Sequence, residues 1–550
     1  MLGADPSRRG AARVRCSAGR VGDTLPAMRV HRLGTALWAL LCPSLAAQEV
    51  AYALRIQDRA AQVAEVTATF PAAGHDALEL FLPTWSPGFY RLENHHEQVI
   101  GFAARGDDGT PLGVEKPRDN RWRVATAGAA AVTVTYSLSC KRGSVTGNQI
   151  AEDFAVFCGP ATWVGEVGAP ARPHVVSITL PDGWRDTATG LPRAPDGQPH
   201  RYAARDYDWL LDSPIVLGNV TTTTFDVFGA RHEWSAFGDG GDWDAALLAP
   251  KLQPVTAELC RTFGAVPFSR YVFLAGFRNA NGGLEHLDSS LLSVSRRQRP
   301  DDPGFLSFVA HEYAHAFNVK RLRPVELGPF DYENPPRTPS LWIAEGLTTW
   351  FGDLALVRGG AVTPAVWLDL VSGHVRSLQR TPGRRRQTLV DASLSVWTGS
   401  VSGTGGDPRK TVSYYVKGPV VGFVLEARLR AATDGRHGLD EVMRRAYARY
   451  AGERGFRPEE FEAVVAGVAG APQAAFFDRV LRSTEEIDYA EALAWFGLRF
   501  AAVADDASRP DPWRLEVLPE ADAAARAHLQ VLLAPTPEPA AWTSAAASDR

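Results

Sequence analysis

The sequence predicts a multidomain protein in which an N-terminal, all-β sandwich-like domain is followed by a mainly α domain. Two observations predict this order. Apolar and polar residues alternate repeatedly between residues 49 and 220, as in strands, whereas apolar residues recur at helical spacing from 303 to about 480. With 550 residues and a hydrophobic content of 45%, the chain is long enough to form two or three domains.

We expect residues 1–47 to lie outside these domains, as an unstructured extension plus a signal peptide. From Met28 the sequence runs through a charged stretch, the apolar run 33–41 and small residues ending at Ala47. This order is typical of a secretory signal, so Met28 is the expected start, and we expect export to the periplasm or the extracellular space. The apolar run is far shorter than the roughly 20 residues that span a bilayer.

The predicted β-rich domain covers residues 49–220. Alternation is clear at 131–138, and turn sequences such as Gly-Asp-Asp-Gly at 106–109 separate the runs. Short alternating strands at this spacing favour a sandwich. The pattern then changes to an amphipathic helix over 242–259, within a second predicted domain at 221–500.

The cysteines leave two points open. Cys42 permits a lipid anchor, but Leu41 before it is too large for a good lipobox, so we favour export without an anchor. Cys140 and Cys158 either form a disulfide or remain buried thiols, and Cys260 is an odd third cysteine. None has the paired spacing of a zinc site.

A motif with metal-binding spacing lies in the first helix expected after residue 301. Asp302 is placed to cap this helix, and Pro303 fits its first turn. His311 and His315 are four residues apart, so the helix presents both imidazoles to a zinc ion. Glu312 can take a proton from water on the metal as general base. Two core histidines are the alternative, which the intervening Glu312 disfavours.

Glu345 is the expected third zinc ligand. It lies in a second predicted helix, which Ser340 is placed to cap and Gly359 to end. A solvated carboxylate is the alternative, but the neighbouring residues are apolar, and an uncompensated charge among them would be costly. Three protein ligands would leave the fourth position of a catalytic zinc for water.

Two further segments are expected to contribute to the site. Gly282, Gly283, Glu285 and His286 follow a strand-like run at 271–275. The glycines would let the backbone approach a substrate, and Glu285 would face the cleft and bind the terminal ammonium of a peptide. An ordinary glycine-rich turn with an exposed acid is the alternative.

The second of these segments opens a buried helix at Tyr414 and Tyr415. A phenol near zinc could donate to the developing oxyanion; two aromatic core residues are the alternative. The glycine-rich stretch at 399–406 predicts a mobile loop near the cleft, and residues 530–550 are expected to fray. The net charge of −4 makes nucleic acid an unlikely partner.

Longer strings resemble one family. His311-Glu-x-x-His315 with Trp342-x-x-Glu345-Gly346 resembles the gluzincin metallopeptidases, which include aminopeptidase N. The strings at 315–324, 327–332 and 282–286 are similar to the bacterial glycyl aminopeptidase family. Leu82-Pro-Thr-Trp-Ser-Pro-Gly-Phe-Tyr90 is similar to that family's β-rich N-terminal domain. The resemblance covers roughly residues 50 to 500.

The resemblance implies a thermolysin-like catalytic domain with one zinc ion, held by His311, His315 and Glu345. It implies that Glu312 is the general base, that Glu285 holds the substrate's free amino group, and that Tyr415 stabilises the oxyanion. The family is named for release of N-terminal glycine, and some members also accept alanine.

The chain departs from the family pattern in two places. The zinc motif of the family usually contains two aromatics, where this chain has Tyr313 and Ala314. Family members commonly end in a PDZ domain, whereas residues 501–550 are expected to form a short tail without one. These differences concern substrate preference more than they concern the predicted zinc site.

Together, the motifs predict an exported zinc aminopeptidase acting on peptides that begin with a small residue. One alternative is a zinc endopeptidase of the same fold, in which Glu285 is only structural. Another is a secreted, non-catalytic binding protein that uses the fold as a scaffold. The presence of Glu312 disfavours the scaffold, because a scaffold requires only metal ligands.

Overall fold

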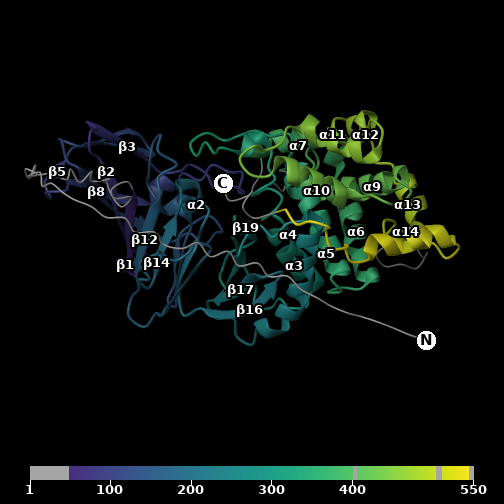
Figure 1. Ribbon diagram of the computed structural model, residues 1–550, viewed down its shortest axis with the longest axis horizontal. Helices are drawn as coiled ribbons and strands as arrows, with labels where there is room; N and C mark the ends of the chain where they lie inside the picture. The colour runs from purple at the N-terminus through teal and green to yellow at the C-terminus, as the bar shows by residue number, and fades with distance from the viewer. Residues whose placement is uncertain (1–48, 400–405, 503–510, 544–550) are drawn as a thin grey trace, which may run out of the picture. The chain divides into compact units, whose positions relative to one another are not determined.

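The computed structural model describes residues 49–399, 406–502 and 511–543. The expected signal peptide and most of the predicted loop at 399–406 lie outside these residues. Strands occupy the described chain from Val50 to Ser293, and helices dominate from Pro303 onward (Figure 1). The predicted fold class, a β-rich N-terminal part followed by a mainly helical part, is confirmed.

The largest sheet has seven strands in the order β14-β12-β1-β2-β8-β4-β5. Its strands are β1 (Val50–Asp58), β2 (Val63–Pro71), β4 (Val99–Gly106), β5 (Pro111–Leu112), β8 (Ala131–Ser139), β12 (His174–Thr179) and β14 (Arg201–Ala204). Along β2 and β8 every second residue is buried, as the alternation predicts, because successive side chains of a strand point to opposite faces.

Two four-stranded sheets share an apolar core with the large sheet. One has the order β13-β15-β10-β9 and the other β11-β3-β7-β6. Their strands are β3 (Ala77–Phe81), β6 (Val114–Arg118), β7 (Arg121–Ala125), β9 (Gln149–Ile150), β10 (Phe154–Phe157), β11 (Gly165–Glu166), β13 (Asp186–Thr189) and β15 (Ile215–Gly218). Phe102 stacks on Trp122 at 4.6 Å between ring centroids, so side chains of the large sheet and of the second small sheet meet directly. Two short helices, α1 (Gly159–Thr162) and α2 (Tyr207–Leu211), lie between these strands in the sequence.

A five-stranded sheet continues the strands past the predicted change to helix. Its order is β16-β17-β18-β20-β19, with β16 (Thr221–Val227), β17 (Ala230–Phe237), β18 (Arg270–Gly276), β19 (Gly283–Glu285) and β20 (Ser289–Ser293). The amphipathic helix is present as α3 (Ala249–Phe263), but it connects the parallel pair β17 and β18. Residues 283–285 form an edge strand rather than a glycine-rich turn, because they pair with β20.

The helical part begins with the two predicted helices. Asp302 caps α4 (Pro303–Ala314) by accepting a hydrogen bond from the Phe305 amide at 2.9 Å. The second helix is α5 (Thr348–Arg358), preceded by a π-helical turn, η5 (Trp342–Leu347), and ended by Gly359. The predicted cap at Ser340 is wrong: only its carbonyl accepts helical amides, because the turn begins one residue later.

The remaining helices follow in chain order. They are α6 (Pro364–Gln379), α7 (Leu389–Leu394), α8 (Val396–Gly399), α9 (Tyr414–Ala432), α10 (Leu439–Tyr450), α11 (Pro458–Ala469), α12 (Ala474–Leu481), α13 (Ala490–Phe496) and α14 (Ala523–Leu533). A small hairpin of β21 (Leu498–Phe500) and β22 (Leu515–Val517) comes between the last two. No helix in the described ranges combines the length and apolar character that crossing a membrane requires.

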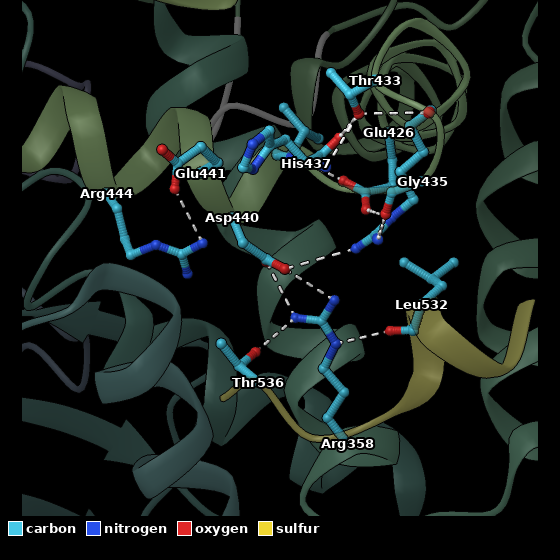
Figure 2. Close-up of polar contacts among 12 residues, drawn as sticks. Arg358, Glu426, Thr433, Gly435, His437, Asp440, Glu441, Arg444, Leu532 and Thr536 are labelled. Carbon is cyan, nitrogen blue, oxygen red and sulfur yellow. Dashed lines mark hydrogen bonds and ion pairs between the residues drawn. The ribbon is translucent and has the colours of Figure 1, made fainter. Parts of the chain in front are cut away.

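The C-terminal segment packs against the helical core, so the expected fraying does not hold for residues 530–543. Nε of Arg358, at the end of α5, donates to the Leu532 carbonyl and Nη1 donates to the Thr536 hydroxyl (Figure 2). Nη1 and Nη2 both bind Asp440 at 3.0 Å. The guanidinium is buried, and these partners compensate its charge. Thr543 forms a bridge with Ala265.

The cysteines of the described chain are free. Cys140 and Cys158 are buried thiols, as is Cys260, so the disulfide alternative is not realised. Burial raises the pKa of both Cys140 and Cys158 to about 12. The thiols therefore stay protonated and pack as small apolar side chains.

Candidate active site

The three predicted metal ligands come together from two helices. Nε2 of His311 lies 2.9 Å from Nε2 of His315, and Oε2 of Glu345 lies 3.1 Å from His315 and 3.5 Å from His311. Glu345 is only 1% exposed, and no residue of the described chain outside this triad hydrogen-bonds to either of its oxygens. Two imidazoles and one carboxylate are the donor set of a catalytic zinc site, so these residues fit the metal that the sequence predicts.

Neighbouring polar groups fix the orientation of both imidazoles. Nδ1 of His315 lies 2.9 Å from the Asn318 carbonyl, and Nδ1 of His311 lies 3.1 Å from Oγ1 of Thr349. With Nδ1 protonated and donating, each ring directs the lone pair of Nε2 toward Glu345. Thr349 also donates to the Glu345 backbone carbonyl at 3.1 Å. The sequence analysis missed these supports; the local signal was a polar residue three or four positions after a ligand.

Asn318 also joins the two ligand-bearing elements. Its side-chain amide donates to the Ile343 carbonyl at 2.8 Å, in the π-helical turn, and to Oγ1 of Thr348 at 2.9 Å. Asn318 is fully buried. It therefore helps to hold His315 and Glu345 at a fixed separation.

Tyr313, the aromatic residue inside the zinc motif, points away from the predicted metal ligands. It is fully buried, and its hydroxyl lies 2.9 Å from Nε2 of His232. Its ring packs among Tyr271 and Phe273 of β18. This ring therefore belongs to the core between α4 and the five-stranded sheet.

Glu312, the predicted base, is buried against the backbone of β19. A Cβ atom added at Gly283 would lie 2.5 Å from Oε1 of Glu312, so only glycine leaves room for this carboxylate. Oε2 of Glu312 has no hydrogen-bond partner in the described chain. Burial raises the pKa of Glu312 to about 8; the charge of His315 opposes the rise, and the carboxylate of Glu285 adds to it. A bound dication would lower this pKa.

Glu285 lies two residues further along the same edge strand, with its carboxylate against the β-rich part of the chain. A Cβ atom at Gly88 would lie 2.4 Å from Oε1 of Glu285, and that oxygen has no hydrogen-bond partner among the described residues. Burial raises the pKa of Glu285 to about 7, which the charge of His315 opposes. Glu285 is therefore a buried acid that forms no ion pair with another described residue.

A very small cavity of about 20 Å³ lies beside Glu285. Residues from both halves of the chain line it: Trp85, Pro87, Gly88, Tyr90, Glu285, Val319, Lys320, Leu327 and Phe330. The indole of Trp85 donates to the Asp331 carbonyl at 2.8 Å, which anchors this wall. The sequence analysis quoted the 82–90 string only for its family resemblance and did not place it at the site.

The other two members of the predicted glycine-rich segment have different surroundings. His286 is 5% exposed, and its Nδ1 lies 3.0 Å from Oδ1 of Asp212, which also binds Lys320 at 2.7 Å. Burial lowers the pKa of His286, and Asp212 opposes this. Gly282 adopts a left-handed conformation, with φ of 83°, and lines a separate, larger pocket.

Both predicted tyrosines lie at the site. The Tyr415 ring centroid is 5.9 Å from that of His311 and 4.9 Å from that of Tyr414. Tyr414 is 1% exposed, and its hydroxyl has no hydrogen-bond partner in the described chain. Burial raises the pKa of each phenol, and the charge of Glu345 adds to the effect, so both remain hydrogen-bond donors. Tyr90 is a site residue that the sequence analysis missed. Burial raises the pKa of its phenol, and the charges of Glu345 and Glu285 add to the rise.

Comparison with protein families gives two matches along the chain. Residues 51–219 match the Peptidase M61 N-terminal domain, and residues 304–421 match the M61 glycyl aminopeptidase. Together these matches cover about half of the chain. They include the metal-ligand triad, Glu312 and Tyr415. A search of the curated proteins found no match.

Solved structures with a similar fold are also peptidases or hydrolases. An aminopeptidase N family protein from Idiomarina loihiensis is 27% identical, with a TM-score of 0.77 over 82% of this chain and 78% of that chain. An M1 zinc metallopeptidase from Deinococcus radiodurans, bound to a Tyr-Ser-Ala substrate, is 12% identical, with a TM-score of 0.53 over 80% of this chain and 94% of that one. Yeast LTA4 hydrolase in complex with bestatin is 13% identical, with a TM-score of 0.52 over 80% and 68%. At these identities the last two likenesses concern the fold alone.

Proposed function

The chain belongs to the M61 glycyl aminopeptidase family of metallopeptidases, and on that premise we propose that it is an exported zinc aminopeptidase that removes glycine or alanine from peptides. The observation that carries the proposal is the arrangement around the predicted metal ligands. A buried carboxylate, Glu312, lies beside His311 and His315, and a second one, Glu285, lies on the edge strand that passes the metal ligands. The first supplies a base and the second a site for a free amino group.

Zinc held by His311, His315 and Glu345 would supply a Lewis acid that polarises the scissile carbonyl and acidifies water. Glu312 takes the proton of the attacking water and returns it to the leaving amine. The Tyr415 hydroxyl donates to the oxygen that becomes negative as the carbonyl carbon turns tetrahedral. Tyr414 is the alternative donor.

Glu285 makes the reaction an aminopeptidase reaction rather than an internal cleavage. Its Oε1 oxygen lacks a partner, so the ammonium of a free N-terminus would compensate its buried charge. An acetylated N-terminus offers no such charge. Glu285 therefore selects substrates whose scissile bond follows the first residue.

The small cavity beside Glu285 favours a small first side chain. Its volume of about 20 Å³ is little more than that of one water-sized group. A hydrogen atom or a methyl group fits without displacing Trp85 or Tyr90, whereas a leucine side chain does not. This supports a preference for glycine and alanine.

The experiment that tests the proposal uses zinc-loaded protein and a Glu312→Gln control. Matched peptides that start with Gly, Ala or Leu, each with a free or an acetylated N-terminus, are incubated with both proteins. We expect cleavage of free Gly and Ala peptides only, and none by the control. Cleavage of acetylated peptides would identify an endopeptidase instead, and no cleavage by the wild type would favour a binding protein.

Export is the part of the proposal that rests on residues 28–47 alone. N-terminal sequencing of protein recovered from the periplasm or the culture medium checks it. A mature terminus close to Ala47 is expected. Recovery of the intact leader from the cytosol would contradict export.

A further inference from the structure

A second, larger pocket opens beside the candidate active site, at one end of the five-stranded sheet. β18 and β20 are parallel neighbours, so the loops that follow them meet at the same edge. Arg278 follows β18, and Arg296 and Arg297 follow β20. These loops line an open pocket of about 630 Å³, and no acidic residue of the described chain is among its lining residues.

Arg278 is a buried cation without a carboxylate partner in the described chain. It is 9% exposed, and only Nη1 is bonded, to the Ser144 carbonyl at 3.0 Å and to Oε1 of Gln149 at 3.4 Å. Nε and Nη2 have no hydrogen-bond partner. Burial of an uncompensated charge is costly, so an anion in the pocket would be stabilised by this guanidinium.

The other two arginines lie closer to solvent. Arg296 forms an exposed ion pair with Asp239 at 2.8 Å. Arg297 is exposed, and no carboxylate of the described residues pairs with its guanidinium. The pocket therefore combines one buried and one exposed cation that are both unpaired within the described chain.

The pocket adjoins the reacting centre at two residues. Gly282 lines it and directly precedes Gly283, which contacts the Glu312 carboxylate. Phe308 also lines it and lies one helical turn before Glu312 on α4. Along β19, Glu285 comes on one side of Gly283 and the pocket on the other.

This order gives the pocket a direction relative to a bound peptide. If the free amino group is held at Glu285 and the scissile bond lies at Glu312, the residues after that bond extend past Gly283 toward Gly282. Each extended residue adds about 3.3 to 3.6 Å. The second or third residue of the substrate then reaches the pocket.

We propose that this pocket binds a carboxylate on the leaving-group side of the substrate, with Arg278 and Arg297 as specificity-determining residues. The inference rests on the proposed aminopeptidase function and narrows its substrates to short peptides with a free C-terminus, or to peptides with an acidic second or third residue. Both sources present the same group, a carboxylate, to the same arginines. Guanidinium groups bind carboxylates by charge-assisted hydrogen bonds.

The test compares three substrates, Gly-Ala-Ala, its C-terminal amide, and the amide of Gly-Ala-Asp, on the zinc-loaded protein. A carboxylate at the pocket should raise kcat/KM by on the order of tenfold over the neutral amide, since a hydrogen bond to a charged group contributes at about this level. Preference for Gly-Ala-Ala identifies the terminal carboxylate, and preference for Gly-Ala-Asp amide identifies the acidic side chain. Equal rates on all three overturn the proposal and leave the aminopeptidase function intact.

Arg297→Gln should abolish the preference, while the matched control Arg299→Gln should keep it. Arg299 is also exposed, is paired with Asp301 at 3.0 Å, and does not line the pocket. Arg278→Gln should act like Arg297→Gln, but the latter carries the test, since the buried Arg278 also has a structural bond to Ser144. Retention of the preference in Arg297→Gln overturns the assignment.

Calorimetry on the Glu312→Gln protein gives a readout without turnover. We expect the preferred carboxylate peptide to bind about tenfold more tightly than the neutral amide, and this difference to vanish when Arg297→Gln is added. If the wild type cleaves no peptide, the proposed function fails, but calorimetry still shows whether the pocket binds a carboxylate. Equal affinities of all three peptides would overturn it.

Discussion

Replacement of Gly283 by alanine should remove the general base from its working position without disturbing the metal ligands. The added Cβ atom would lie 2.5 Å from Oε1, 2.6 Å from Cδ and 2.9 Å from Cγ of Glu312, and these are its three nearest contacts. Ordinary contact needs about 3.5 Å. The carboxylate must therefore move back by about 1 Å. Gly283 does not have positive φ, so alanine adds no backbone strain.

The magnitude follows from the sensitivity of proton transfer to distance. Displacement of a reacting group by 1 Å can reduce the rate by about 10²-fold, which corresponds to about 2.7 kcal/mol in the activation free energy. We therefore expect kcat to fall by about 10²-fold in Gly283→Ala. KM and the zinc content should change little, because Glu285, the proposed site for the amino group, and the predicted ligand triad remain in place.

The assay measures kcat and KM with a free Gly peptide, zinc content by elemental analysis, and Tm. Gly373→Ala is the matched control: Gly373 lies in α6, and no atom lies within 4 Å of an added Cβ. The control should keep full activity and gain about 0.5 to 1 kcal/mol in stability, since alanine is favoured within helices. Full kcat in Gly283→Ala at full zinc occupancy would refute Glu312 as the base at this position. Loss of zinc would refute the idea that only the base is displaced.

Three further predictions concern other parts of the molecule. Tyr415→Phe should lower kcat by on the order of 10²-fold while Tyr414→Phe has a smaller effect, as measured with a free Gly peptide; the reverse order would assign the oxyanion donor to Tyr414. Glu285→Ala should reduce kcat/KM for free-amine peptides far more than for any residual cleavage of acetylated ones, and equal losses would favour an endopeptidase. Arg358→Met should lower the free energy of unfolding by about 3 kcal/mol, because the buried Asp440 loses both of its 3.0 Å bonds and keeps only the 3.9 Å ion pair with Arg430. Burial raises the pKa of Asp440, but the charge of Arg358 outweighs burial and holds the pKa below its usual value. The stability that this pair contributes is therefore present above a pH of about 4 and is lost on acidification. Thermal unfolding across pH checks this, and an equal loss of stability on acidification in wild type and variant would contradict it.

Features that depend on local spacing could be predicted from the sequence. Period-two alternation placed the buried faces of β2 and β8, and the four-residue interval between His311 and His315 put both rings on one side of α4. The cap at Asp302 follows the same logic, because a side chain reaches amides only two or three residues away. The wrong prediction of a cap at Ser340 shows the limit of this reasoning. The helix there begins with a π-helical turn, and the N-cap position falls on Leu341 instead.

Contacts between distant parts of the chain could not be predicted in this way. Gly88 lies against Glu285 and Gly283 lies against Glu312, yet no local pattern in the sequence pairs either glycine with that carboxylate. The packing of residues 530–543 is hidden for a similar reason. Their small and polar composition suggests a free tail, whereas in the structure distant groups hold them, among them the buried guanidinium of Arg358 (Figure 2).

The sequence by itself determined the order of the β-rich and helical parts and predicted the metal ligands and the base, because these depend on residue types at fixed short intervals. The tertiary structure alone decided that Trp85 and Tyr90 line the cavity beside Glu285. It also decided that Arg278 and Arg297, from two different loops, line one pocket. Such neighbours result from how strands pair and how domains pack. That packing is the sum of many weak apolar contacts, none of which has a fixed spacing in the sequence.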